Sequence, residues 1–112
     1  MSASTETRLW LAQRASAAVL ALCVAVHLAT MIIAVQGGLS AADVLGRTRG
    51  SAAWALFYGV FVLAVSIHAP LGLRTVASEC LGWRGAFADT TCAMIGFTLL
   101  ALGLLAVAAV TL

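Results

Sequence analysis

Three long apolar runs, separated by short polar segments, dominate the pattern of the chain. They cover residues 15–35, 52–73 and 91–112, and each has more than twenty residues. Twenty-one residues rise about 31 Å as a helix, which matches a hydrocarbon core of about 30 Å. The pattern predicts an all-α membrane protein, with three transmembrane helices in an up-down-up bundle. Residues 1–14 are expected to form an N-terminal segment ahead of one transmembrane domain, residues 15–112.

The connection after the first run contains a helix start signal. Ser40 is followed three residues later by Asp43, which resembles a capping box. We expect a short interfacial helix over residues 41–45 and a loop over residues 46–50.

Proline and glycine predict local features of the second and third helices. Pro70 removes the backbone hydrogen bond that would reach the Ser66 carbonyl, so a kink is expected there. Gly96 and Gly103 lie seven residues apart on one helix face. Small residues at this spacing predict a close approach of a neighbouring helix.

Composition supports lipid as the solvent for most side chains. The 112 residues are 63% hydrophobic and 9% charged, and the mean hydropathy is +1.11. Soluble domains carry about 25% charged residues. A net charge of +2 excludes a nucleic-acid footprint, and the isolated cysteines, Cys23, Cys80 and Cys92, are interpreted as small packing residues.

Arginine counting predicts the orientation. Four arginines (Arg8, Arg14, Arg74 and Arg84) belong to the N-terminus and the second connection, which lie on one side of a three-span protein. The first connection holds only Arg47 and Arg49. The positive-inside rule therefore predicts a cytoplasmic N-terminus, in a multi-pass protein of the inner (cytoplasmic) membrane.

Two histidines inside the apolar runs are the candidate functional residues, because ionisable groups in a bilayer are costly. His27 shares a narrow helical stripe with Ser16, Leu20, Cys23 and Thr30, and this stripe is expected to face protein or a cofactor.

His68 shares a helix face with Phe57, Phe61, Ala64 and Gly72. Such a face suits a flat apolar ligand, and neutral imidazole binds haem iron well. The alternative is that each histidine only donates or accepts a hydrogen bond with a neighbouring helix.

Depth argues against one iron bound by both histidines of one chain. His27 lies thirteen residues from Arg14 and His68 six residues from Arg74, or about 20 Å and about 9 Å from that boundary. A second copy or a related chain would let each histidine pair with its counterpart, giving two stacked haems.

The motifs around these residues resemble the membrane-anchor cytochrome b subunits of succinate dehydrogenase and fumarate reductase. Residues 13–17 (Gln-Arg-Ala-Ser-Ala) are similar to the element that opens the family's first helix. Residues 68–74 resemble the HxxxGxR stretch whose histidine ligates haem b. Ala17 replaces the usual glycine, and helix three adds only length and hydrophobicity. The dihaem anchors of this family have five spans in one chain, and this chain resembles half of one of them.

The resemblance implies an electron-transfer anchor subunit. His27 and His68 would ligate haem b iron, and Arg74 would contact a haem propionate. Arg14 and Ser16 would bind quinone. Soluble flavoprotein and iron–sulfur subunits, together with a second anchor chain, would be its partners.

Several alternatives remain at this stage. Arg14 and Arg74 also suit topological anchors, and Glu79 suits a pair with Arg74, a partner contact or a solvated surface. The chain as a whole also suits a haem-free structural anchor. A small dimeric transporter fits the length, but no predicted span contains the carboxylate that proton coupling requires.

Overall fold

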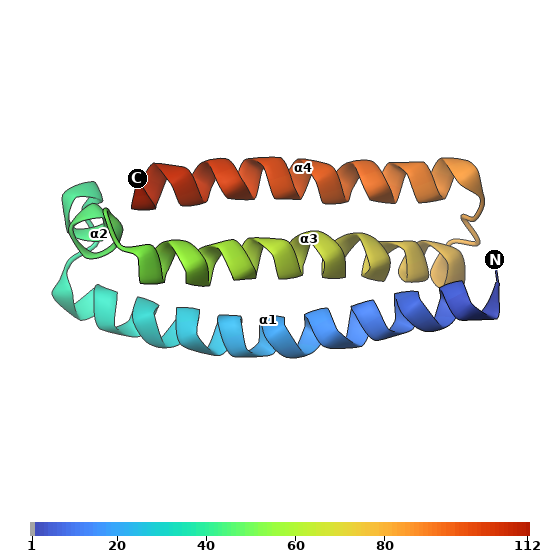
Figure 1. Ribbon diagram of the computed structural model, residues 1–112, viewed down its shortest axis with the longest axis horizontal. Coiled ribbons are helices and arrows are strands. Elements are labelled where there is room, and N and C mark those ends of the chain that lie inside the picture. The colour runs from blue at the N-terminus through green and yellow to red at the C-terminus, as the bar shows by residue number, and fades with distance from the viewer. Residues whose placement is uncertain (1) are drawn as a thin grey trace.

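The computed structural model describes residues 2–112, and these form four helices without a strand. They are α1 (Ala3–Gly37), α2 (Ala41–Thr48), α3 (Ala52–Cys80) and α4 (Ala86–Thr111). Figure 1 shows the three long helices side by side and α2 closing one end. The predicted all-α fold with three helices long and apolar enough to cross a membrane is confirmed.

Helix α3 is the centre of the bundle. It packs against α1 on one side and against α4 on the other, and the chain direction alternates from helix to helix (Figure 1). The predicted up-down-up arrangement is therefore present. The bundle measures 49 × 24 × 22 Å, so its length exceeds the hydrocarbon core of a bilayer.

The helices are longer than the predicted ranges. Helix α1 begins at Ala3 instead of residue 15, so most of the N-terminal segment is helical, and α3 continues to Cys80 instead of residue 73. Helix α4 begins at Ala86 instead of residue 91, and α2 reaches Thr48, within the predicted loop. Hydropathy delimits only the apolar part of a helix. The helical hydrogen bonds continue into polar sequence, and the Ser2 side chain caps α1 by accepting from Thr5 N–H.

Most large apolar side chains face outward. Leu22, Ile33 and Phe97 are 71%, 67% and 70% exposed, and among residues 2–112 the buried apolar side chains are all alanine or cysteine. In water this surface would be unfavourable at about 25 cal/mol per Å² of apolar area. The bundle is therefore built for lipid on its outside.

Helix α1 contacts α3 along a heptad stripe. Eight of its less exposed positions recur at spacings of four and three, and Ala12 and Ala17 flank this stripe; the eight are Leu9, Gln13, Ser16, Leu20, Cys23, His27, Thr30 and Ala34. This spacing is the seam of a left-handed helix pair. The predicted polar stripe of helix one thus faces protein, which places His27 between α1 and α3.

Two glycines let α4 approach α3 closely, as predicted. A Cβ on Gly103 would lie 2.5 Å from Val62 Cγ1. A Cβ on Gly96 would lie 3.0 Å from Pro70 Cγ and 3.1 Å from the Ser66 carbonyl oxygen. That carbonyl is the one that Pro70 deprives of its helical donor, so the close approach of Gly96 covers the gap in the ladder.

Helix α3 continues for ten residues beyond Pro70. Figure 1 shows no break at that point of the ribbon. The expected kink stays a prediction, while the continuity of α3 brings His68 and Arg74 onto one helix.

The capping box at the start of α2 is confirmed. The Ser40 side chain accepts from Asp43 N–H at 3.1 Å, and the Asp43 carboxylate accepts from Ser40 N–H at 3.2 Å. The Ser40 hydroxyl also donates to this carboxylate at 2.6 Å, and these bonds lower the pKa of Asp43 below its ordinary value.

Two hydrogen bonds connect α2 and the residues after it to the end of α4. Thr48 Oγ1 donates to the Val110 carbonyl at 2.6 Å, and Gly50 N–H donates to the Thr111 carbonyl at 2.8 Å. Carbonyls in the last turn of a helix lack helical donors, so these bonds satisfy the terminus of α4. The α2 end of the bundle is thereby closed around the His27 side of the α1–α3 interface.

Candidate functional site

His68 lies in the α1–α3 interface and contacts Ser16. Its Nδ1 atom is 3.4 Å from Ser16 Oγ, and the Ser16 side chain is buried. Ser16 Oγ also donates to the Gln13 carbonyl at 3.0 Å. The heptad seam places Ser16 opposite His68, so two candidates that the sequence assigned to different ligands are brought together.

His27 lies in the same interface, nearer α2, and contacts Tyr58 and Phe61. Its Nδ1 atom is 3.4 Å from Tyr58 Oη. The imidazole ring meets both aromatic rings edge-on, at centroid distances of 5.9 Å to Tyr58 and 5.8 Å to Phe61. Two side chains, Tyr58 through its ring and hydroxyl and Phe61 through its ring, therefore contact the imidazole and restrict its rotation.

The two histidines occupy separate levels of the bundle. Ser16 and His27 are eleven residues apart on α1, and Tyr58 and His68 are ten residues apart on α3. At 1.5 Å per residue these spacings correspond to about 15–16 Å along the helix axis. Because each level pairs one histidine with a hydroxyl, His27 and His68 of one chain do not converge on a single metal ion.

The aromatic cluster of α3 belongs to the level of His27. Trp54, Phe57, Tyr58 and Phe61 are in mutual contact, and Phe61 reaches His27. The sequence assigned Phe57 and Phe61 to the face of His68. They do share that helix face, but the distance along α3 places them beside the other histidine.

Arg74 pairs with Asp89 across the α3–α4 junction. Arg74 Nε donates to Asp89 Oδ1 at 2.7 Å, and the two side chains are 34% and 49% exposed. The salt bridge suggested between Arg74 and Glu79 is not formed. The first turn of α4 brings Asp89 next to Arg74, whereas a spacing of five residues along α3 turns Glu79 away from it.

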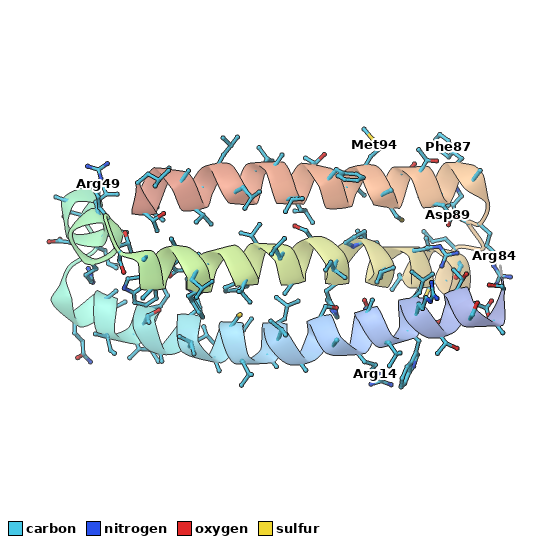
Figure 2. The ribbon with its side chains drawn as sticks, viewed as in Figure 1. Arg14, Arg49, Arg84, Phe87, Asp89 and Met94 are labelled. Carbon is cyan, nitrogen blue, oxygen red and sulfur yellow. The ribbon has the colours of Figure 1, made fainter. Side chains whose placement is uncertain are left out.

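Arg14 lies on a different side of α1 from Ser16. Its guanidinium is 5.4 Å from the Trp10 ring centroid, a cation–π contact, and Figure 2 shows it directed away from α4. Ser16 faces α3 instead. The two residues predicted to bind quinone therefore do not share one face of α1.

A groove of about 580 Å³ opens between the first part of α1 and the last part of α3. Arg14, Arg74, Trp10 and Gln13 are among its lining residues. Gln13 Oε1 is the one buried side-chain polar atom without a hydrogen-bond partner among residues 2–112. A buried amide oxygen without a donor is costly, so Gln13 is an unsatisfied polar residue in the wall of the groove.

Both imidazoles retain a nitrogen for a ligand. In each ring Nδ1 is engaged, and within the described chain neither Nε2 atom forms a hydrogen bond or is buried without a partner. Metal-bound histidines commonly use one nitrogen for the metal and the other for an orienting partner. No group of three or more His, Cys, Asp or Glu in residues 2–112 could hold a metal, so each level offers one ligand only.

Tyr58 is the contact residue that the sequence did not identify. An aromatic residue near the start of an apolar run is typical of a membrane–water interface, so the position of Tyr58 in the sequence does not indicate a contact with His27. Tyr58 and His68 lie ten residues apart on α3, and His27 and Ser16 lie eleven apart on α1. In an antiparallel pair, matched spacings of this kind signal two cross-helix contacts, and the pairing of Ser16 with His68 would have predicted Tyr58 beside His27.

The comparison with protein families identifies the family of this chain. The model of the succinate dehydrogenase/fumarate reductase transmembrane subunit matches residues 1–111. The chain belongs to this family. The match also covers α4, which the motifs alone left unsupported. It confirms the resemblance seen in residues 13–17 and 68–74. Neither the curated proteins nor the solved structures gave a match.

Membership in the transmembrane subunit family establishes a multi-pass membrane anchor. The transporter interpretation is disfavoured, since the four carboxylates (Glu6, Asp43, Glu79 and Asp89) all lie near the ends of the bundle. His27 and His68 are half-buried polar groups of a succinate dehydrogenase/fumarate reductase anchor, at two depths of its α1–α3 interface.

Proposed function

We propose that the protein is a haem b-binding anchor subunit that passes electrons between soluble redox subunits and membrane quinone. The Ser16–His68 contact carries the proposal. A buried hydroxyl engages Nδ1, so Nε2 is the nitrogen left for iron. Haem bound there would supply the one-electron chemistry, while the protein supplies orientation and a low-dielectric environment.

A second anchor chain, identical or related, completes each iron site. His27 and His68 are separated by about 15 Å along the bundle, and each has a hydroxyl and not a histidine opposite it. Pairing His68 with its counterpart, and His27 with its counterpart, gives two haem levels across the membrane. The exposed apolar outer surface of the bundle provides the area for this association.

Quinone is the proposed substrate at the arginine-bearing end. The groove beside Arg14 offers Trp10 as an aromatic wall and the unpartnered Gln13 oxygen as an acceptor for a quinol hydroxyl. Ser16, which the sequence grouped with Arg14, lies two residues further along α1, about 3 Å deeper, where it contacts His68. Its proposed part at the quinone site is therefore to link the site to the His68 level.

The same end is proposed to face the cytoplasm and to bind the soluble partners. It carries four of the six arginines, which favours the cytoplasmic side. Figure 2 shows Arg84 and Asp89 at that end. Flavoprotein and iron–sulfur subunits docked on this surface would stand close to the groove. In this proposal Arg74, already paired with Asp89, exchanges that partner for a haem propionate.

A haem-free anchor is the second candidate, since both Nδ1 atoms already bond a neighbouring helix. The reduced-minus-oxidised visible spectrum of the complex, purified after co-expression with its soluble subunits, separates the two. We expect a reduced α-band of haem b that His68→Ala abolishes or shifts, and from which His27→Ala removes a different fraction.

Thr30→Ala is the matched control for these variants. The Thr30 hydroxyl donates only to the His27 carbonyl of its own helix, at 2.7 Å, so its loss should leave the spectrum unchanged. A colourless, fully assembled wild-type complex would refute the haem proposal and favour the haem-free anchor.

A further inference from the structure

The hydrogen bonds of the two histidines have opposite polarity. Ser16 Oγ has one hydrogen, and its shorter bond, 3.0 Å to the Gln13 carbonyl, takes that hydrogen. The longer contact, 3.4 Å to His68 Nδ1, must then be accepted by Ser16 Oγ from an Nδ1–H group. This leaves His68 Nε2 unprotonated, with its lone pair free.

In the hydrogen bond between Tyr58 and His27, the hydroxyl is the donor instead of the acceptor. In residues 2–112 its hydroxyl has one hydrogen-bond partner, His27 Nδ1, at 3.4 Å. If Tyr58 accepted from Nδ1–H, the phenolic hydrogen would have no acceptor in a half-buried position, which is unfavourable. Tyr58 therefore donates to His27 Nδ1, and the hydrogen of the neutral His27 ring resides on Nε2.

The surroundings of His27 contain no charged side chain that competes with Tyr58 for the ring. His27 and Tyr58 line a cavity of about 290 Å³ whose other walls come from α2, α3 and α4, among them Val44, Val62 and Gly103. No Asp, Glu, Lys or Arg lines this cavity. The Tyr58 hydroxyl is therefore the group in this cavity that selects the tautomer of His27.

We propose that Tyr58 is a positioning residue that holds His27 in the tautomer opposite to that of His68, so that His68 is the first nitrogen ligand available to iron. For His27 to bind through Nε2, its proton must pass from Nε2 to Nδ1. The Tyr58 hydroxyl must then turn and accept that hydrogen, leaving its own without a partner. The order in which haem fills the two levels rests on the proposed haem function. The assignment of the two tautomers does not depend on haem.

The tautomers are measurable in the haem-free full-length chain. The chain has two histidines, so ¹⁵N-histidine labelling in lipid nanodiscs gives only two sets of ring nitrogen signals. We expect one ring protonated at Nδ1 and the other at Nε2. Tyr58→Phe, which keeps the aromatic packing, should change only the His27 signals, and Ser16→Ala only those of His68. Two rings in the same tautomer, or Tyr58→Phe without effect on His27, would overturn the proposal.

Haem titration of the assembled complex tests the consequence separately. The first equivalent should survive His27→Ala and be lost in His68→Ala. Tyr58→Phe should tighten binding at the His27 level, because His27 then binds through Nε2 without leaving the Tyr58 hydrogen without a partner. Absence of haem from every variant would refute the proposed function while the tautomer measurement still holds. Equal loading of both levels in the wild type would refute the order of loading alone.

Discussion

Gly103→Ala should weaken the packing of α4 on α3 by an amount that the structure specifies. The new Cβ would lie 2.5 Å from Val62 Cγ1 and 2.9 Å from Cγ2, whereas carbon atoms pack at about 3.5–4.0 Å. Val62 is β-branched and has one strongly preferred rotamer in a helix, so rotation gives little relief. The helices must separate by about 1 Å, and such overpacking costs about 1–3 kcal/mol.

Gly59→Ala provides the matched control. Gly59 is in α3, and a Cβ there meets nothing within 4 Å. Both substitutions gain the helix propensity of alanine, about 1 kcal/mol, so this term cancels in the difference between the two variants. That difference should equal the steric cost alone, about 1–3 kcal/mol or about 5- to 150-fold in the unfolding equilibrium.

The assay is reversible unfolding of the purified chain in mixed micelles with increasing sodium dodecyl sulfate, followed by tryptophan fluorescence. Val62→Ala should rescue Gly103→Ala, with a coupling free energy of about 0.5–3 kcal/mol in a double-mutant cycle. Equal stabilities of Gly103→Ala and Gly59→Ala, together with no coupling to Val62, would show that α4 does not pack on α3 as described.

Three further substitutions and conditions probe the two ends of the bundle. Arg74→Gln should cost less than about 1 kcal/mol and lose its effect at high salt, because the bridge to Asp89 is partly exposed; unfolding at two ionic strengths measures this. Hydrogen bonds from Ser40 lower the pKa of Asp43, so their stabilisation of α2 is complete above the ordinary carboxyl pKa of 3.8 and is lost as the pH falls through the lower folded value. The protection of the α2 amides, which is the exchange rate corrected for its intrinsic pH dependence, should fall only below that range, and a fall above it would contradict the assignment. Thr48→Val should remove the bond to the last turn of α4, costing about 1 kcal/mol in the same unfolding assay.

The fold followed from sequence because lipid imposes a simple rule. A run of more than twenty apolar residues in this setting forms a spanning helix, so the three helices, their alternation and the polar stripe through His27 were all predictable. The ends of the helices were not, because hydropathy reports the bilayer boundary and not the last backbone hydrogen bond. Residues 3–14 illustrate this, since they are polar yet helical.

The candidate site was predictable in its residues but not in its pairings. His27, His68 and Ser16 stood out as polar groups within apolar runs. Their partners depend on the register between α1 and α3, which a single sequence does not state. The register placed Ser16 against His68 and Tyr58 against His27. For Arg74, the contact with Asp89 required the fold of the α3–α4 connection, which no helical periodicity describes.

The haem content of the complete, co-expressed complex, measured by pyridine haemochrome assay against the amount of anchor chain, tests the central claim most directly. Two stacked levels, each shared between paired anchor chains that both supply a histidine, predict two haems for every two chains, and loss of the His68 level in His68→Ala. A fully assembled complex without haem would contradict this account, as would loss of all haem in His68→Ala, which is the result expected when His27 and His68 of the same chain hold one haem.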